Sequence, residues 1–147
     1  MISSLKDLKG GKIGLDSMIF IYAFEEHPTY LTSLNSLFSS LERGDLGAAT
    51  STLTIMECLV RTYLKKDFGL AAQYLVLFRN FPHLSACPFT EGIAERAALL
   101  RAQYRVRTPV DIQLATALNS GCHAFLTNDA GLPQVEGVQT LVLDRML

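Results

Sequence analysis

The sequence predicts an α/β fold in which a parallel sheet carries helices on both of its faces. Short apolar runs alternate along the chain with longer segments of helical periodicity, which is the pattern of a doubly wound sheet. The chain has 147 residues, and 49% of them are hydrophobic. This is enough for one domain with a substantial core, and no linker or repeat divides it. We therefore expect residues 1–147 to form a single domain.

The N-terminal part of the chain is expected to contain one strand and two helices. The apolar run over residues 12–15 predicts a buried strand. Residues 17–25 are apolar and expected to be helical as far as Pro28, because the residue before a proline disfavours the α region. Apolar side chains recur at helical spacing over residues 29–43, and Gly44 is a suitable residue to end this helix.

The middle of the chain predicts a strand, two helices and another strand. A run of small residues over 46–50 is expected to form the second strand. Helical spacing continues over residues 51–64, where a hydroxyl residue caps the first turn, and over residues 68–78. Residues 84–87 predict a short third strand.

The C-terminal part predicts two helices and two strands. A threonine caps the alanine-rich helix expected over residues 91–104. Pro109 opens the next helix, over residues 110–120, because proline suits a first helical turn. The two last strands are expected over residues 123–126 and 138–143.

Composition excludes several classes of protein. No apolar run approaches the roughly 20 residues of a membrane span, and the first residues lack the apolar core of a signal peptide. We therefore expect a cytoplasmic protein without a membrane partner. The net charge of −1 argues against a non-specific nucleic-acid coat. The three cysteines lack zinc-ligand spacing and are expected to be buried in a reducing compartment.

Four carboxylates stand where such a fold would bring them together. Asp16 follows the first expected strand, Glu57 lies in the helix after the second, Asp111 begins a late helix, and Asp129 follows the strand before the last. Open α/β sheets place their ligand crevice outside the carboxyl ends of the strands. Each acid also has a structural alternative: a helix cap for Asp16, a solvated helix face for Glu57, a helix-dipole contact for Asp111 and a turn for Asp129.

Converging carboxylates repel one another unless a divalent cation neutralises them. Oxygen ligands suit Mg²⁺ or Mn²⁺, and the matching chemistry is phosphodiester hydrolysis. Ser17 and Thr127 are candidates to hold a metal-bound water or a phosphate oxygen. Arg61, Arg105 and Arg107 are candidate phosphate contacts, with a solvated surface as the alternative.

Four segments in order resemble PIN-domain ribonucleases, and among them the toxin component of VapBC-type toxin–antitoxin pairs. The segments are LDSMIFIYAFEEHP, STLTIMECLV, RTPVDIQLATAL and AFLTND. The resemblance runs from about residue 12 to residue 143. It implies a three-layer α/β/α sandwich around a parallel sheet of four to five strands. It also implies Mg²⁺- or Mn²⁺-dependent cleavage of RNA, with Asp16, Glu57, Asp111 and Asp129 as catalytic metal ligands.

The same resemblance implies protein partners. A cytoplasmic toxin requires a neutralising antitoxin, and members of the family often form homodimers. The apolar helices expected over residues 29–43 and 51–64 are the candidate surfaces for these contacts.

One motif departs from the family pattern. The family usually has an acid directly after the Thr-Pro pair, whereas this chain has Val110 there and the acid follows at Asp111. One residue on a helix corresponds to a rotation of about 100°. Either the start of the helix is adjusted, or Asp111 points away from the other acids.

This departure motivates the main alternative function, a PIN-fold module that binds RNA or protein with weakened catalysis. A second alternative is a small phosphatase of another α/β class. That class usually has a second aspartate two residues after the first, and this chain has Met18 at that position.

Overall fold

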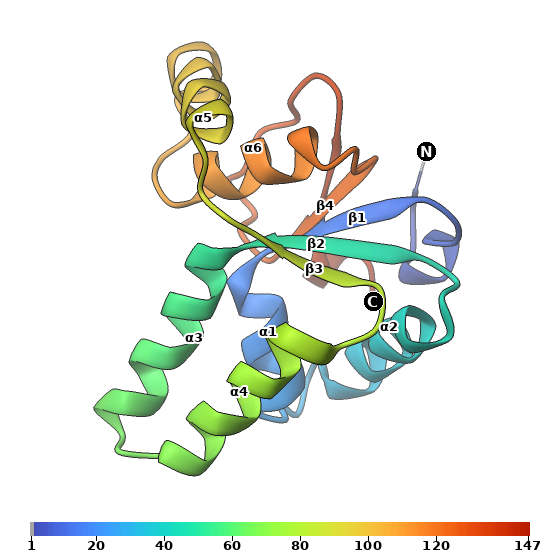
Figure 1. Ribbon diagram of the computed structural model, residues 1–147. Coiled ribbons are helices and arrows are strands. Elements are labelled where there is room, and N and C mark those ends of the chain that lie inside the picture. Colours follow the sequence, from blue (N-terminus) through green and yellow to red (C-terminus); the bar gives the residue numbers. More distant parts are fainter. Residues whose placement is uncertain (1) are drawn as a thin grey trace.

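The centre of the computed structural model, which describes residues 2–147, is a five-stranded parallel sheet (Figure 1). Its strands are β1 (Lys12–Leu15), β2 (Gly47–Ser51), β3 (Leu84–Cys87), β4 (Ala124–Thr127) and β5 (Gln139–Val142). Their order across the sheet is β3-β2-β1-β4-β5, and every neighbouring pair is parallel. The predicted parallel sheet is therefore confirmed, at five strands.

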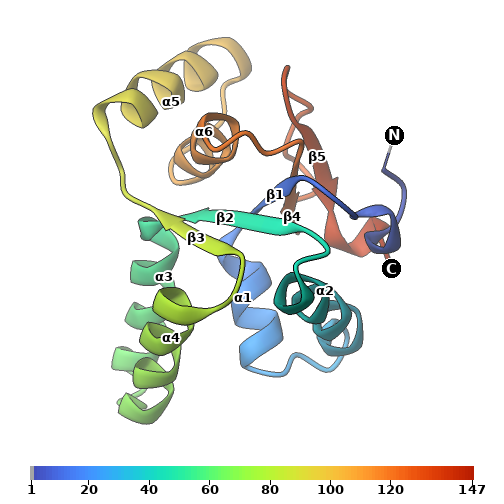
Figure 2. The same cartoon turned by 45° about the vertical axis from the view of Figure 1, so that its right-hand side comes forward.

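Six α-helices cover the two faces of this sheet. They are α1 (Ser17–Phe24), α2 (Leu31–Arg43), α3 (Thr52–Leu64), α4 (Phe68–Asn80), α5 (Glu91–Tyr104) and α6 (Val110–Asn119). Helices α1 to α4 lie on one face, and α5 and α6 lie on the other (Figures 1 and 2). The result is the predicted three-layer α/β/α sandwich. Within residues 2–147, none of the helices combines the length and the apolar character that crossing a membrane requires.

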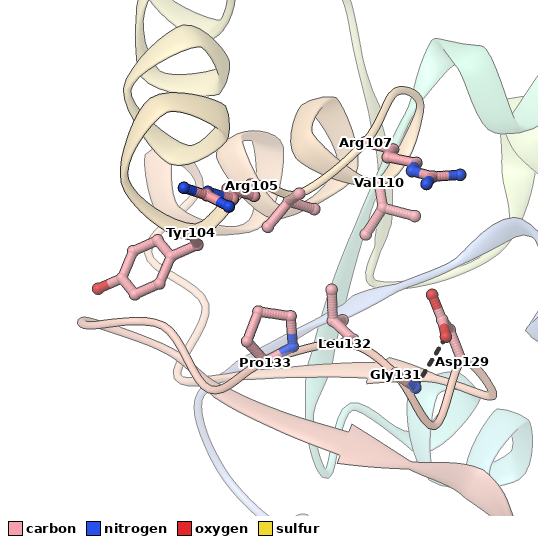
Figure 3. Close-up of a pocket in the computed structure, with 9 residues that line it drawn as sticks. Tyr104, Arg105, Arg107, Val110, Asp129, Gly131, Leu132 and Pro133 are labelled. Atoms are coloured by element: carbon pink, nitrogen blue, oxygen red, sulfur yellow. Dashed lines mark hydrogen bonds between the residues drawn. The ribbon is translucent and has the colours of Figure 1, made fainter.

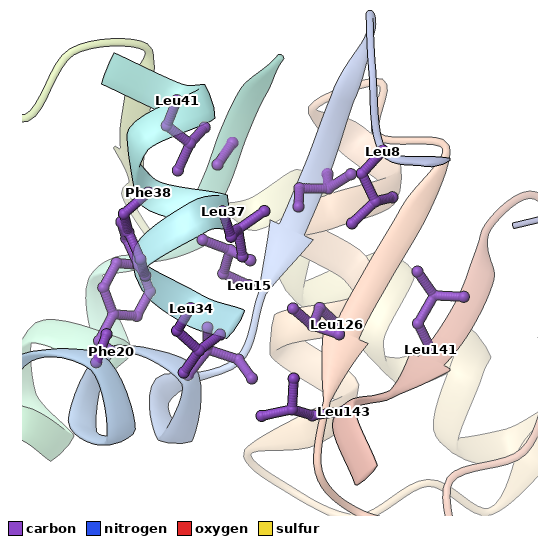
Figure 4. Packing of buried hydrophobic residues seen from close by; sticks show 14 of the residues in the cluster. Leu8, Leu15, Phe20, Leu34, Leu37, Phe38, Leu41, Leu126, Leu141 and Leu143 are labelled. Atoms are coloured by element: carbon purple, nitrogen blue, oxygen red, sulfur yellow. The ribbon is translucent and has the colours of Figure 1, made fainter. Parts of the chain in front are cut away.

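Each face of the sheet has its own apolar core. Ile13 and Leu15 of β1 point toward α1 and α2, where they join the larger core (Figure 4). Phe125 of β4 points to the opposite face, into the smaller core beneath α5 and α6. Successive side chains of a strand alternate between faces. A strand covered on both faces therefore reads as a continuous apolar run, as the runs in this sequence do.

Gly14 allows α6 to lie directly on β1. A Cβ atom at this position would be 2.7 Å from the Cβ of Ala117 and 2.9 Å from a ring carbon of Phe125. Neither neighbour is a flexible chain end, so a larger residue would push α6 away from the sheet. The close contact fixes the position of α6, whose first turn reaches the carboxyl edge of the strands.

Local signals set the ends of several helices, as expected from the sequence. The side-chain oxygen of Ser51 accepts a hydrogen bond from the Leu53 amide at 3.1 Å and caps α3. Gly44 follows α2 with a φ of 80°, the left-handed conformation in which glycine is not strained. The cysteines are free thiols, and burial raises the pKa of Cys58 and of Cys122 to about 12.

Candidate functional site

The site lies beside β1, the strand at which the chain stops adding strands on one side of the sheet and begins to add them on the other. From the central strand β1 the chain adds β2 and then β3 on one side, and later β4 and β5 on the other. The carboxyl ends of β1 and β4 therefore flank a topological switch point, where open α/β sheets hold their ligands. Asp16 is the first residue after β1, and Asp129 lies two residues beyond the end of β4.

Asp16 is held by both strands and by the following helix. Its amide donates to the Leu126 carbonyl of β4 at 3.0 Å, and its Oδ1 accepts from the Ser17 amide at 2.8 Å, which caps α1. Its Oδ2 accepts from the Thr127 hydroxyl at 2.7 Å. Burial raises the pKa of the Asp16 carboxyl, the hydrogen bonds from Thr127 and Ser17 partly offset the rise, and the charge of Asp129 adds to it. Asp16 thus caps α1, and its carboxylate is close enough to Asp129 for the two charges to interact.

Glu57 projects from α3 next to Asp16. Within residues 2–147 its Oε1 is buried and has no hydrogen-bond partner. Burial raises the pKa of the Glu57 carboxyl, and the charge of Asp16 raises it further, while Ser17 and Gln113 partly offset both effects. A buried carboxylate oxygen without a partner is costly, so this atom requires a cation or a proton.

Asp129 faces solvent at the mouth of the crevice. Its amide donates to the Thr127 hydroxyl oxygen at 3.1 Å, which ties its backbone to the group that holds Asp16. Its Oδ1 accepts from the Gly131 amide at 2.9 Å, as in the turn considered for this residue. Within the described part of the chain, no three His, Cys, Asp or Glu side chains converge closely enough to hold a metal ion together.

Asp111, expected with the other acids, has different neighbours in the structure. Its carboxylate is 3% exposed and is held by the Arg101 guanidinium of α5 at 2.9 Å and by the Thr108 hydroxyl at 3.3 Å. The side chain thus faces α5, which is one of the two orientations considered for it. Asp111 pairs with a cation of the protein, and its role as a metal ligand stays a prediction.

Of the expected phosphate and water contacts, two lie at the site and one is engaged elsewhere. Ser17 and Thr127 are buried and touch Asp16. Arg61 is paired with Glu25 of α1, with its Nη2 3.3 Å from Oε1 of that residue. This ion pair joins α1 to α3, and a contact between Arg61 and phosphate stays a prediction.

The PIN domain family matches residues 13–138, which is most of the chain. The protein belongs to the PIN domain family. A comparison with curated proteins found no match.

Solved structures agree with this assignment at the level of the fold. VapBC2 from Rickettsia felis, solved with a DNA fragment from its promoter, is 15% identical with a TM-score of 0.70, over 90% of this chain and 98% of that one. FitAcB from Neisseria gonorrhoeae is 18% identical with a TM-score of 0.66, over 90% and 98%. A toxin–antitoxin complex from Klebsiella pneumoniae is 23% identical with a TM-score of 0.63, over 90% and 97%.

In this PIN domain, Val110 is the first residue of α6 and directly precedes Asp111. Its side chain and that of Asp129 line one trough between the segment that follows α5 and the loop that follows β4 (Figure 3). Asp111 lines a different depression, against α5. Two neighbouring residues of α6 therefore line different depressions: Val110 shares one with Asp129, and Asp111 lies in the other.

Gln113 is a residue of this PIN domain that sequence reasoning missed. It is 1% exposed, its Nε2 donates to the Thr54 hydroxyl at 2.7 Å, and its Oε1 accepts from the Ser51 amide at 3.3 Å. Thr54 is also bonded to Thr50, whose hydroxyl donates to the Leu15 carbonyl. This buried network joins α6 to the carboxyl ends of β1 and β2 and to the start of α3. The available signal was an amide side chain between the apolar residues Ile112 and Leu114.

Proposed function

We propose that this PIN domain is an endoribonuclease that depends on Mg²⁺ or Mn²⁺. The observation that supports this most directly is the buried Oε1 of Glu57, which lies beside a second acid, Asp16, and has no hydrogen-bond partner among residues 2–147. Burial raises the pKa of both carboxyls, and a neighbouring charge adds to each rise: that of Asp129 at Asp16, and that of Asp16 at Glu57. A divalent cation between them would satisfy the free oxygen and remove the repulsion.

Asp16 and Glu57 are the proposed metal ligands, and Asp129 joins through water or by turning its exposed side chain. Two carboxylates are sufficient for Mg²⁺, which keeps several waters and completes its shell with substrate phosphate. When bound, the ion would supply an activated water and neutralise charge on the phosphate. Thr127 orients Asp16 through its hydroxyl, and Ser17 fixes the other carboxylate oxygen through its amide.

A cleavage assay on single-stranded RNA tests the proposal. The purified protein should cut RNA with Mn²⁺ or Mg²⁺ and stop with EDTA. Asp16→Asn and Glu57→Gln should each lower the rate at least 100-fold, while Asp45→Asn, an exposed aspartate paired with Arg43, should not change it. Activity that persists in Asp16→Asn, or in EDTA, would overturn the mechanism.

We further propose that the protein is the toxin of a toxin–antitoxin pair. The family assignment supports this role, and so does the likeness of its fold to chains from VapBC, FitAB and Klebsiella toxin–antitoxin complexes. Induced expression in a bacterial host should slow growth, and Asp16→Asn should abolish the effect. Unimpaired growth with the active protein would rule out a toxin role without affecting the nuclease proposal.

An exposed apolar stripe on α3 supports the expected protein partners, and we assign it to a homodimer. Met56, Val60, Tyr63 and Leu64 recur at helical spacing, and Leu64 is 80% exposed. The apolar residues of α2, the other candidate surface, are buried in the core. Val60→Lys with Leu64→Lys should convert a dimer to a monomer in light scattering. Leu99→Lys, on the opposite face of the sheet, should not.

The weakened binding module remains the second candidate, because Asp111 is held by Arg101 and the residue directly after Pro109 is Val110. Calorimetry with Mn²⁺ separates the two functions. Binding that is lost in Glu57→Gln supports the nuclease, and no binding at millimolar Mn²⁺ supports the module.

A further inference from the structure

The trough beside Asp129 is larger than a metal site requires. It has a volume of about 480 Å³ and lies between the segment that follows α5 and the loop that follows β4. Ligand pockets for small molecules begin at about 300 Å³. The trough therefore has room for a group of the size of one nucleotide, directly beside a proposed acid of the reaction.

The trough combines an apolar interior with two cationic side chains. Val110, Leu132 and Pro133 form its apolar surface, and Arg105 and Arg107 stand above them (Figure 3). Both arginines are exposed, and within residues 2–147 neither has a carboxylate at ion-pair distance. The nearby Arg101, in contrast, is paired with Asp111.

Two features hold the trough in shape. The Tyr104 hydroxyl oxygen accepts a hydrogen bond from the Glu136 amide at 3.0 Å, which ties the end of α5 to the loop after β4. Arg105 follows α5 with a φ of 59°, and its amide donates to the Arg101 carbonyl at 2.9 Å. That left-handed conformation favours glycine and is strained for other residues. A charged side chain is thus kept at a position where glycine would be more stable.

We infer that this trough binds one unpaired nucleotide of an RNA strand next to the phosphate that is cut. The base lies against Val110, Leu132 and Pro133, and the adjoining phosphate lies between Arg105 and Arg107. Unpaired bases are recognised by stacking on apolar and guanidinium surfaces, and phosphates by arginine. The inference rests on the proposed ribonuclease function and adds a preference for single strands over duplexes.

Binding measured without cleavage tests this inference separately from the proposed reaction. Fluorescence anisotropy would follow a labelled 12-nucleotide single-stranded RNA in EDTA. Arg105→Gly combined with Arg107→Gln should raise the Kd at least 10-fold. It should also reduce the salt dependence, log Kd against log salt, by about 0.7, since the two arginines hold one phosphate and each phosphate contact on a single strand contributes roughly 0.7. Arg79→Gln, an exposed arginine on α4, should change neither quantity.

The choice of variants keeps a negative result interpretable. Arg105→Gly relieves a left-handed arginine, so its Tm should be unchanged or higher, and loss of binding would not be a folding defect. Leu132→Ser should weaken binding without altering the salt dependence. A double variant that binds like the unaltered protein, or an unaltered protein that binds duplex RNA as tightly as single strands, would overturn the inference. Binding without cleavage in Mn²⁺ would support the trough and count against the ribonuclease.

Discussion

Arg101 on α5 holds Asp111 on α6 through two nitrogen atoms, with Nε at 3.1 Å and Nη2 at 2.9 Å from the same carboxylate oxygen. The pair joins two helices of one layer, and it gives an acid of the third motif a structural role. Two predictions follow from the different surroundings of Asp111 and of its neighbour Val110.

Loss of the ion pair should reduce stability and leave metal binding unchanged. Arg101→Met leaves a buried carboxylate with fewer donors, which should lower the free energy of unfolding by about 1–2 kcal/mol. Urea denaturation would measure this loss. Asp111→Asn should bind Mn²⁺ in calorimetry as the unaltered protein does. Mn²⁺ binding that weakens in Asp111→Asn as much as in Glu57→Gln would return Asp111 to the metal site.

A carboxylate at position 110 should strengthen the proposed metal site. Val110 and Asp129 line the same trough, so Val110→Asp adds a charge on the crevice side of α6. Calorimetry should show at least 10-fold tighter Mn²⁺ binding. Val110→Asn, of the same shape without the charge, is the control and should have little effect. Equal affinities for the two variants would mean that this position does not reach the ion.

Glu57→Gln should make the metal-free protein more stable at neutral pH. Burial and the charge of Asp16 raise the pKa of Glu57 in the folded protein. The penalty for ionising it is absent below the pKa of the unfolded chain, about 4.3, and grows as pH rises through the folded value. In EDTA the variant should therefore have the higher Tm at pH 7, and the difference should close below about pH 4.

Two comparisons make this result specific. Mn²⁺ should raise the Tm of the unaltered protein and not that of Glu57→Gln, since only the carboxylate binds the ion. Glu95→Gln, an exposed glutamate on α5, should have no pH-dependent effect. A Tm difference for Glu57→Gln that is the same at pH 4 and pH 7 would show that ionisation is not its cause.

Gly14→Ala should destabilise the fold because its Cβ would clash with Ala117 and Phe125. Overpacking of this kind costs about 1–3 kcal/mol, which thermal or urea unfolding would detect. Gly92→Ala on α5 is the matched control, since its Cβ would meet nothing closer than 3.9 Å. The control should be neutral or stabilised by up to about 1 kcal/mol. Equal effects would show that α6 can move away from β1 without cost.

The architecture was predictable from the sequence because the patterns that specify strands, helices and helix caps are local. Apolar periodicity located every strand and helix to within a few residues, and Gly44 and Ser51 ended or capped helices as expected. Covered strands are apolar throughout, and this sequence contains such runs between helical segments. The order of the strands then brings Asp16 and Asp129 to one edge.

The features that the sequence did not reveal depend on contacts between segments that are far apart in the chain. Arg61 pairs with Glu25 across 36 positions, and Gln113 bonds to Thr54 across 59. No spacing rule reveals such partners. The side chain of Asp111 turns toward Arg101 of α5, and from the sequence this orientation was only one of two alternatives. The sequence indicates Arg105 and Arg107 as candidate phosphate contacts. Only the structure shows that, within residues 2–147, neither arginine has a carboxylate at ion-pair distance.

The strand order also affects the protein during its synthesis on the ribosome. β4 completes the side of β1 that faces β5, and Thr127, which holds Asp16, comes at its end. Residues 124–127 leave the ribosome long after Asp16 and Glu57 have been synthesised. A growing polypeptide thus carries two of the acids without the strand that positions them, and we expect it to be harmless to the RNA of the ribosome that is translating it.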